Sequence, residues 1–349
     1  MGSFRVFSRS LLTRSASYPD QVYHIVLNNE DSDSLCYEVG GVLGVCPEND
    51  IDLVSRLLRF FSLPEEFLVH DSEGNLISVF DFLRLKANLV KISSKMKNLL
   101  GVEGKFSFYR LDDFAAPRRD FDYLNCFADL FLPLLPRLYS IASSPQVSKE
   151  RLELIVRLIC IQDPDAEIMR YGVCSDYLCR RAAIGSVIKA FVRPSPHFTL
   201  RETMFGKPIL MIGAGTGIAP YRAFLQHRIV IEDPGQNILI FGERSSKSDF
   251  YFENFWRSQV FQDRLSLFSA FSRDQTEKVY VQDRIKEQQE LVYDTLVRKE
   301  GFVFVCGSKT MGMSVRKTLQ EILGKGDLES GKLRFKEIRE DDRYFVDLY

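Results

Sequence analysis

Three glycines at alternate positions mark the stretch of the sequence best suited to bind a charged group. Residues 208–224 read Pro-Ile-Leu-Met-Ile-Gly-Ala-Gly-Thr-Gly-Ile-Ala-Pro-Tyr-Arg-Ala-Phe, which places Gly213, Gly215 and Gly217 between a short apolar run and an amphipathic helical pattern. Glycine permits positive φ and close approach of the backbone, and the first N–H groups of a helix lack partners within it. An anion, above all a pyrophosphate, is the expected ligand. Because the spacing is not G-x-G-x-x-G, a purely structural turn stays open as the alternative.

The segment Arg-Leu-Tyr-Ser-Ile-Ala-Ser-Ser-Pro, residues 137–145, brings a cation, an aromatic ring and a hydroxyl group together. On a strand, Arg137 and Tyr139 share one face and Ser140 points to the other. A pyrophosphate, an isoalloxazine ring and a flavin nitrogen would each find a partner there. The alternative is a half-buried strand with a surface arginine.

A second helix start of the phosphate-binding type is predicted at Gly172-Val-Cys-Ser175. The glycine turn is followed by Ser175 as the cap of a helix that begins at Asp176. An ordinary helix cap would explain the same four residues.

A basic segment follows a predicted strand at residues 271–282, Phe-Ser-Arg-Asp-Gln-Thr-Glu-Lys-Val-Tyr-Val-Gln. Ser272, Arg273 and Lys278 could hold a phosphate monoester, the arginine through its planar fork and the lysine as a point charge. Tyr280 could lie against a purine ring. A solvated charged loop is the alternative.

The C-terminal residues Arg343-Tyr-Phe-Val-Asp-Leu-Tyr349 alternate as in a strand and end on an aromatic ring. Chain ends are normally polar and mobile, so we expect something to cover Tyr349. Cys306 ends a short apolar run, where it is either part of the site or a small buried core residue.

The N-terminal half of the chain must position the aromatic strand and the second helix start. Alternating apolar residues over 21–45 predict antiparallel strands. Residues 49 to about 130 are mostly helical in pattern and predict an insertion within this β region. The later elements expected here are strands at Leu138 and over 152–161, a helix near Ser175 and a strand over 187–192.

In the C-terminal half, short apolar runs alternate with helical stretches. The runs lie at residues 237–241, 265–270 and 302–306, and this alternation predicts a parallel sheet with helices on both faces. Ligands of such sheets lie at the carboxyl ends of the strands. One crevice should therefore be lined by Gly213, Phe241, Ser272 and Cys306.

The chain has 349 residues, enough for about two domains. A hydrophobic fraction of 45% and a charged fraction of 27% are those of an ordinary globular protein. A formal net charge of -1 argues against nucleic acid or an anionic membrane as a partner. No apolar run reaches the ~20 residues of a membrane span. The best candidate, residues 123–136, contains Asn125 and Asp129.

Seven cysteines without a C-x-x-C pair fit a reducing compartment such as the cytoplasm, and four scattered histidines predict no metal site. Residues 1–19 carry three arginines and five serines and no acidic residue, which predicts a disordered polar tail. A targeting segment, leading to an organelle matrix, is the alternative.

Together and in this order, the five motifs make the chain resemble the FAD- and NADPH-binding portion of the diflavin reductases. This family contains cytochrome P450 reductase, the sulfite reductase flavoprotein and the diflavin reductase of cytosolic iron–sulfur assembly. The resemblance covers about residues 20–349. It implies an α/β plus β fold. An antiparallel FAD-binding β-barrel over residues 20–204, with a helical connecting insertion at about 49–130, would precede a parallel-sheet, ferredoxin–NADP reductase-like domain over 205–349.

The resemblance also implies a role for each matching residue. FAD would be bound by Arg137, Leu138, Tyr139, Ser140, Gly172, Val173, Cys174 and Ser175, with Arg118 contributed by the insertion. NADPH would be bound at its pyrophosphate by Gly215, Thr216 and Gly217, and at its adenosine 2′-phosphate by Ser272, Arg273, Lys278, Tyr280 and Gln282. The hydride-transfer site would be formed by Ser140, Cys306 and Asp347, with Tyr349 stacked on the flavin.

Two departures from the family pattern bear on function. Tyr349 stands where diflavin reductases usually have tryptophan, which leaves the strictness of NADPH over NADH open. The residues before 20 are too few for a flavodoxin-like FMN domain. We therefore expect an NADPH-dependent oxidoreductase that passes electrons from FAD to a separate redox protein. That acceptor would be a flavodoxin-like FMN protein or an iron–sulfur protein, including one in cytosolic iron–sulfur cluster assembly.

Two other functions stay open. The chain could be the flavoprotein subunit of a larger reductase, like P450 reductase or sulfite reductase. It could also be a module that binds a nucleotide or a partner without turnover.

Overall fold

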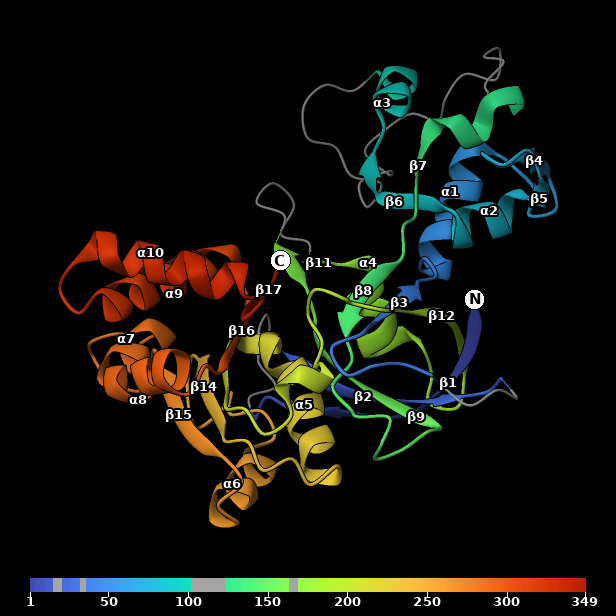
Figure 1. Cartoon of the computed structure of the whole chain (residues 1–349). Coiled ribbons are helices and arrows are strands. Elements are labelled where there is room, and N and C mark those ends of the chain that lie inside the picture. The colour runs from blue at the N-terminus through green and yellow to red at the C-terminus, as the bar shows by residue number, and fades with distance from the viewer. Residues whose placement is uncertain (15–20, 32–35, 102–123, 163–168) are drawn as a thin grey trace.

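The computed structural model describes residues 1–14, 21–31, 36–101, 124–162 and 169–349 (Figure 1). Its N-terminal half is built on an antiparallel sheet with strand order β8-β3-β12-β1-β2-β9, as the sequence predicted. Directly after β8, Ile141 forms a bridge with Leu154 of β9, so the two edge strands meet. The strands are β1 (Gly2–Leu11), β2 (Val22–Asn29), β3 (Val42–Cys46), β8 (Arg137–Ser140), β9 (Arg151–Arg157) and β12 (Val187–Arg193).

The expectation of a disordered tail over residues 1–19 is wrong for most of that segment. Residues 2–11 form β1, which pairs with β12 on one side and β2 on the other. Phe4 and Val6 point into the core and are 3% and 0% exposed. Their alternation with polar residues is the pattern of a half-buried strand, which the arginine and serine content obscured. Residues 15–20 lie outside the described part of the chain.

The insertion between β3 and β8 has a hydrophobic core of its own. Asp50 caps its first helix by accepting a hydrogen bond from the Asp52 N–H at 2.8 Å, as the acidic residue before the helical pattern predicted. The short strands were not predicted, because segments of this length show little periodicity. The elements are α1 (Ile51–Phe61), β4 (Leu68–His70), β5 (Leu76–Ser78), α2 (Val79–Leu85), β6 (Ala87–Ile92), α3 (Ser94–Leu100), η2 (Leu124–Leu130) and β7 (Phe131–Pro133).

A short hairpin and a helix follow β9 and carry the second glycine turn. The helical segment is continuous over residues 173–181, near the expected start. The elements are β10 (Cys160–Gln162), β11 (Met169–Tyr171), α4 (Val173–Asp176) and η3 (Tyr177–Arg181), and η4 (Glu202–Met204) lies in the connection to the second half.

The C-terminal half is a parallel sheet with helices on both faces, as predicted (Figure 1), and its five strands lie in the order β15-β14-β13-β16-β17. Met211 of β13 packs on the side of α5 and α6, and Leu210 packs on the side of α7 to α10. The strands are β13 (Ile209–Ala214), β14 (Asn237–Glu243), β15 (Ser266–Phe271), β16 (Phe302–Gly307) and β17 (Tyr344–Leu348). The helices are η5 (Gly215–Ile218), α5 (Ala219–Val230), α6 (Glu253–Phe261), α7 (Val281–Glu287), α8 (Gln289–Tyr293), η6 (Asp294–Arg298), α9 (Lys309–Gly324) and α10 (Leu328–Glu340).

Helix α5 joins the two halves of the molecule. Nη1 of its Arg222 donates to the Ala142 carbonyl at 2.8 Å and to Glu153 Oε2 at 2.6 Å. His24 of β2 lies 2.6 Å from the same carboxylate oxygen. The helix is therefore packed on both sides rather than amphipathic as predicted, because its outer face meets the N-terminal half instead of water.

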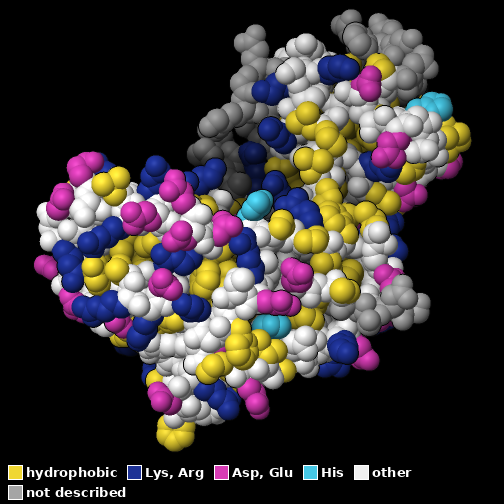
Figure 2. Space-filling view, viewed as in Figure 1, with side chains coloured by type: hydrophobic (Ala, Val, Ile, Leu, Met, Phe, Trp, Pro, Cys, Tyr) yellow, Lys and Arg dark blue, Asp and Glu magenta, His cyan; other side chains and the backbone are white. Residues whose placement is uncertain are grey.

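Two surface properties bear on partners. No helix in the described ranges is long and apolar enough to cross a membrane. Where side chains are coloured in Figure 2, Lys and Arg intermix with Asp and Glu instead of gathering into one basic area. This mixture agrees with the net charge near zero.

Two phenylalanines of β1 test whether this N-terminal strand contributes to the folded core. Replacing buried Phe4 with alanine is expected to lower the free energy of unfolding by about 3–5 kcal/mol, because it leaves a cavity in the core. Phe7 on the same strand is 46% exposed and meets the Arg151 guanidinium at 4.1 Å. Phe7→Ala should therefore cost about 1 kcal/mol or less. Urea unfolding measures both, and equally small losses would mean that β1 is dispensable.

Candidate functional site

The three glycines of the first motif serve three different purposes. Gly215 has a φ of +62°, which favours glycine. A Cβ on Gly213 would lie 2.7 Å from the Tyr221 ring, and a Cβ on Gly217 would lie 2.3 Å from the Cys306 carbonyl oxygen. Only Gly215 thus meets the expected need for positive φ, and the other two allow the turn to pack closely on α5 and β16.

This turn leaves backbone N–H groups available at the start of a long helix. Residues 215–218 form η5, which runs directly into α5, and no side chain caps either N-terminus. A helix of this length carries partial positive charge at its N-terminus. The turn, with Thr216 at its centre, is therefore suited to an anion such as a phosphate.

The ends of β8, β16 and β17 meet near the turn and bring three predicted site residues together. Ser140 Oγ, from the N-terminal half, donates to Asp347 Oδ2 at 3.4 Å. Cys306 of β16 is the parallel partner of Asp347 in β17. The hydrogen bond crosses between the two halves of the molecule, so this cluster exists only when both halves are in place.

Burial sets the protonation of this cluster. Cys306 is fully buried, and burial raises the pKa of its thiol well above the usual value, an effect that neighbouring Asp347 reinforces. Burial also raises the pKa of Asp347, which the hydrogen bond from Ser140 partly offsets. Cys306 is therefore a neutral thiol and not a thiolate nucleophile.

Tyr349 lies against the same cluster and is held at two points. Its backbone N–H donates to the Gly307 carbonyl at 3.1 Å, and its hydroxyl lies 3.0 Å from Thr216 Oγ1. The residue as a whole is 62% exposed, yet burial raises the pKa of its phenol to about 12, so the described residues cover part of the side chain. Tyr349 therefore presents a fixed aromatic ring, part of which is open to a ligand.

The aromatic strand β8 lies at the edge of the antiparallel sheet, beside β3. Arg137 and Leu138 are exposed and Tyr139 is half-buried. Burial, with a contribution from the neighbouring Cys174 thiol, raises the pKa of Tyr139 well above the usual value. Its phenol therefore stays neutral and can only donate or accept hydrogen bonds.

The second helix start is capped by glycine and not by serine. Gly172 is the N-cap of α4, without a side-chain cap, whereas Ser175 lies inside the first turn. Ser175 Oγ donates to the Gly172 carbonyl at 3.0 Å and accepts from the Ile159 N–H at 3.1 Å. Ser175 fixes the shape of the turn from within, so the prediction of a serine cap is wrong. Val173 and Cys174 begin the helix, where first-turn N–H groups are free of side-chain caps.

The basic segment forms a turn after β15, next to the end of β14. The Ser272 N–H donates to the Glu243 carbonyl at 2.9 Å, and the Arg273 N–H donates to the Arg244 carbonyl at 2.7 Å. Arg273, Lys278 and Tyr280 are exposed, and Gln282 lies in the first turn of α7. The set therefore extends from the turn at Ser272 and Arg273 to the start of α7, and its charged side chains are open to solvent.

The predicted crevice is only partly correct. Gly213 is the parallel partner of both Phe241 and Cys306, and Ser272 follows the end of β15, so all four lie toward the same edge of the sheet. Phe241 and Cys306 are 0% exposed, however, and form the floor beneath that edge. The Phe241 ring packs against the rings of Phe250 and Phe271, which strand order alone could not predict.

Arg157 of β9 is a site residue that the sequence analysis missed. Its Nη2 pairs with Glu243 Oε1 at the end of β14 and lies 3.2 Å from the Tyr251 hydroxyl. A Cβ on Gly215 would lie 3.4 Å from both partners of this ion pair. The sequence signal was a single arginine in the otherwise apolar run over residues 154–159.

Asp274 is a second missed residue, because it ties the basic turn to its neighbour. Both of its carboxylate oxygens accept from the Ser246 N–H, at 3.1 and 3.2 Å. Hydrogen bonds from Ser246 and Ser245 lower the pKa of Asp274, whereas burial raises it by a smaller amount. The turn that carries Arg273 is thereby fixed to the loop after β14.

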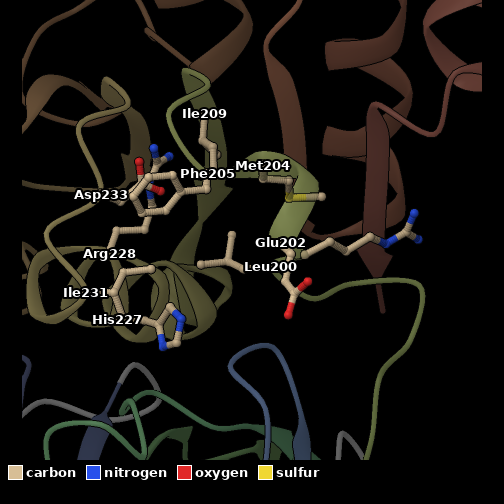
Figure 3. A pocket seen from close by; sticks show the side chains of 10 residues that line it. Leu200, Glu202, Met204, Phe205, Ile209, His227, Arg228, Ile231 and Asp233 are labelled. Atoms are coloured by element: carbon tan, nitrogen blue, oxygen red, sulfur yellow. The ribbon is translucent and has the colours of Figure 1, made fainter.

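Other features lie outside this cluster. Arg118 lies outside the described residues. Within the described ranges, no group of His, Cys, Asp and Glu side chains could hold a metal ion. A cavity of about 320 Å³ opens between the connection to β13 and the C-terminal end of α5, lined by Leu200, Phe205 and His227 among others (Figure 3). It lies at the amino-terminal end of β13, away from the glycine turn.

Comparison with known proteins points to one class of protein. A family model described as "Oxidoreductase NAD-binding domain" matches residues 211–317. The sulfite reductase [NADPH] flavoprotein alpha-component of Mannheimia succiniciproducens is 35% identical over 340 residues, which cover 90% of this chain and 56% of that protein. The protein of the same name from Photobacterium profundum is 33% identical over 353 residues, covering 94% and 57%.

NADPH oxidoreductase A of Dictyostelium discoideum is 29% identical over 384 residues, covering 98% of this chain and 60% of that protein. The chain thus spans somewhat more than half the length of the curated relatives that it matches.

The ion pair between Arg157 and Glu243 gives a test of how the two halves are joined. The Glu243 side chain is only 5% exposed, so Arg157→Met leaves a buried carboxylate without its cation. We expect a loss of about 2–3 kcal/mol in the free energy of unfolding. The double variant Arg157→Met/Glu243→Gln should recover much of this loss, because no buried charge remains unpaired. Strictly additive losses in urea unfolding would contradict the pairing.

Proposed function

The chain belongs to the diflavin reductase family, of which it spans the FAD- and NADPH-binding portion, and we propose that it is an NADPH-dependent flavoprotein reductase. When bound, NADPH and FAD supply the chemistry, in which a hydride passes from nicotinamide C4 to flavin N5. The chain itself supplies binding, orientation and the placement of charge.

The observation that carries this proposal is the hydrogen bond between Ser140 and Asp347. Hydride transfer requires two reacting atoms at near-contact, roughly 3–3.5 Å. A site for two cofactors must therefore lie where flavin-binding and nicotinamide-binding residues meet. Ser140 ends the aromatic strand of one half and Asp347 lies beside Cys306 in the other, which supports a hydride-transfer role for these three residues.

On the flavin side, the residues present fit a flat anionic cofactor. Arg137 and Leu138 are exposed on β8, and Tyr139 presents a neutral ring on the same strand. Gly172, Val173, Cys174 and Ser175 would hold the FAD pyrophosphate at the start of α4, which no side chain caps. Tyr349 offers an open ring against which the isoalloxazine could stack. We propose that the sheet whose edges meet at Ile141 and Leu154 is the FAD-binding barrel.

On the nicotinamide side, the N–H groups of the Gly215 to Gly217 turn and the Thr216 hydroxyl would hold the NADPH pyrophosphate. Arg157 lies beside Gly215 but is paired with Glu243, so it would steady the turn rather than add net charge. The 2′-phosphate would be recognised by the turn after β15 through Ser272, Arg273, Lys278, Tyr280 and Gln282.

Within the cluster, each residue has a distinct role. Ionised Asp347, oriented by Ser140, would stabilise positive charge that develops on a ring beside it. Cys306 would pack against that ring as a neutral thiol. Tyr349 would cover the site until the nicotinamide displaces it.

We further propose that the electrons leave to a separate redox protein, a flavodoxin-like FMN protein or an iron–sulfur protein. The names of the relatives give specific support to a second candidate, a flavoprotein component of sulfite reductase. None of the seven cysteines, all of which lie in the described ranges, forms a disulfide, which supports a reducing compartment such as the cytoplasm. The proposed division into an FAD-binding part up to residue 204 and an NADPH-binding part from 205 onward now includes β1 in the former.

The function is tested by a visible absorption spectrum of the purified chain, with the released flavin identified, followed by anaerobic addition of NADPH. We expect FAD, no FMN and bleaching by NADPH. A colourless protein that FAD cannot reconstitute would contradict the proposal and favour the alternative of a binding module without turnover.

Arg273→Ala tests the site for the 2′-phosphate. Loss of a charged hydrogen bond should weaken NADPH by roughly tenfold to a hundredfold and leave NADH almost unchanged. Lys332→Ala on α10, whose partner is Glu329, is the matched surface control and should alter neither. The KM values for NADPH and NADH measure this effect, and an equal increase in KM for both nucleotides would exclude the role of Arg273 in binding the 2′-phosphate.

The raised pKa of Asp347 predicts how the rate of hydride transfer depends on pH. Because burial raises the pKa of this carboxyl, its ionised form is populated only above the ordinary range of aspartate. The rate of hydride transfer should therefore rise with pH as Asp347 ionises, and Asp347→Asn should remove this acid limb and lower the rate roughly tenfold to a hundredfold. Stopped-flow reduction across pH measures both.

The raised pKa of Asp347 also predicts that this residue makes the fold less stable at neutral pH than at low pH. A carboxyl whose pKa is higher in the folded state loses stability as pH rises from the unfolded to the folded pKa. Asp347→Asn should therefore gain stability relative to the unmodified chain at neutral pH and not at pH 3. If thermal unfolding showed Asp347→Asn to be more stable than the unmodified chain at pH 3 and not at neutral pH, burial would not be raising the pKa of Asp347.

A further inference from the structure

Glu243 places a carboxylate beside the glycine turn that is proposed to bind pyrophosphate. It is the last residue of β14, at the carboxyl end of the parallel sheet, and its side chain is only 5% exposed. A Cβ on Gly215 would lie 3.4 Å from Glu243 Oε1. An uncompensated negative charge at this place would repel an anion held by the N–H groups of the turn.

The described partners of this carboxylate differ in charge. The Tyr251 hydroxyl donates to Glu243 Oε1 at 2.7 Å, and the Arg244 N–H donates to Oε2 at 2.8 Å. Arg157 Nη2 pairs with Oε1. The tyrosine and the backbone amide supply hydrogen bonds without cancelling the charge, whereas the guanidinium of Arg157 does both.

Arg157 reaches this carboxylate from the other half of the molecule. It is the last residue of β9 in the antiparallel sheet, whereas Glu243 and Gly215 belong to the parallel-sheet half. A Cβ on Gly215 would lie 3.4 Å from Arg157 Nη2 as well, so both charges of the pair border the turn. The charge also reaches Tyr349, because burial raises the pKa of that phenol to about 12 and Arg157 opposes the rise.

We infer that Arg157 is a positioning residue that masks the charge of Glu243, so that the glycine turn binds a dinucleotide's pyrophosphate tightly only when the flavin-binding half lies against it. The inference rests on the proposed function and deepens it by naming a residue of the flavin-binding half on which nucleotide affinity depends. Arg157 acts here without touching the ligand. It cancels a charge that would otherwise face the anion.

The test measures NADP⁺ binding by calorimetry in the full chain loaded with FAD. Arg157→Met leaves the carboxylate charged and should weaken NADP⁺ roughly tenfold to a hundredfold at low salt. Glu243→Gln removes the charge and should bind NADP⁺ at least as tightly as the unmodified chain. The double variant Arg157→Met/Glu243→Gln should recover most of the loss, and Arg157→Lys, which keeps the positive charge, should lose much less than Arg157→Met.

Salt separates masking of a charge from a merely structural role. Arg157 and Thr216 are only partly buried, so ions reach this region. The deficit of Arg157→Met relative to the unmodified chain should therefore shrink between about 0.01 M and about 1 M salt, over which the Debye length falls from about 30 Å to about 3 Å. A turn displaced by the substitution would bind NADP⁺ poorly at every salt concentration.

A second ion pair between the two halves provides the matched control. Arg14 of the N-terminal half pairs with Glu253 at the start of α6. Arg14→Met thus removes an arginine–glutamate connection of the same kind without exposing the glycine turn to a carboxylate. It should leave the affinity for NADP⁺ almost unchanged at low and high salt.

The inference and the proposed function fail in different ways. A double variant as weak as Arg157→Met, a loss of affinity in Glu243→Gln, or a deficit that salt does not change would overturn the masking role and leave the proposed function standing. An equal loss in Arg14→Met would do the same. If the unmodified chain loaded with FAD does not bind NADP⁺ at all, the nicotinamide site of the proposed function is wrong, and the inference falls with it.

Discussion

The ion pair between Arg222 and Glu153 links helix α5 of one half of the molecule to the antiparallel sheet of the other. Arg222 lies on α5, the helix that continues directly from the glycine turn, and Glu153 lies on β9 of the antiparallel sheet. Any tilt of α5 would move the turn and its first N–H groups with it. Because Ser140 and Asp347 belong to different sheets, their contact depends on this same alignment. A second cross-connection at Arg157 and Glu243 then fixes the turn from its other side.

Much of this arrangement could be predicted from the sequence, and the successes share a cause. Four of the five parallel strands were found because each is a short, continuously apolar run followed by a helical stretch, whereas β17 was expected as a strand but not as a member of this sheet. The position of Cys306 follows from the same logic, since parallel neighbours end at one edge of a sheet, whereas Asp347 was assigned through the family resemblance alone. The contact of Ser140 with Asp347 is harder to predict, because it joins the two halves of the molecule and no local sequence pattern encodes it.

The failures share a cause as well. The strand at residues 2–11 was hidden by arginines and serines, although Phe4 and Val6 alternate correctly. Ser175 was taken for a helix cap because its residue type is typical of caps, while the structure uses it to bond Ile159 and Gly172. Arg157 and Asp274 act through partners distant in the sequence, and such pairs have no signature until the fold brings them together.

The complete burial of Cys306 also governs how the chain meets oxidants. Only a thiolate reacts readily, and a thiol that is both inaccessible and held neutral is protected on both counts. Cys36 and Cys126 are exposed and belong to other parts of the N-terminal half. Peroxide or an alkylating reagent meets these two sulfurs first, so chemical damage to the surface of the molecule precedes damage to its site.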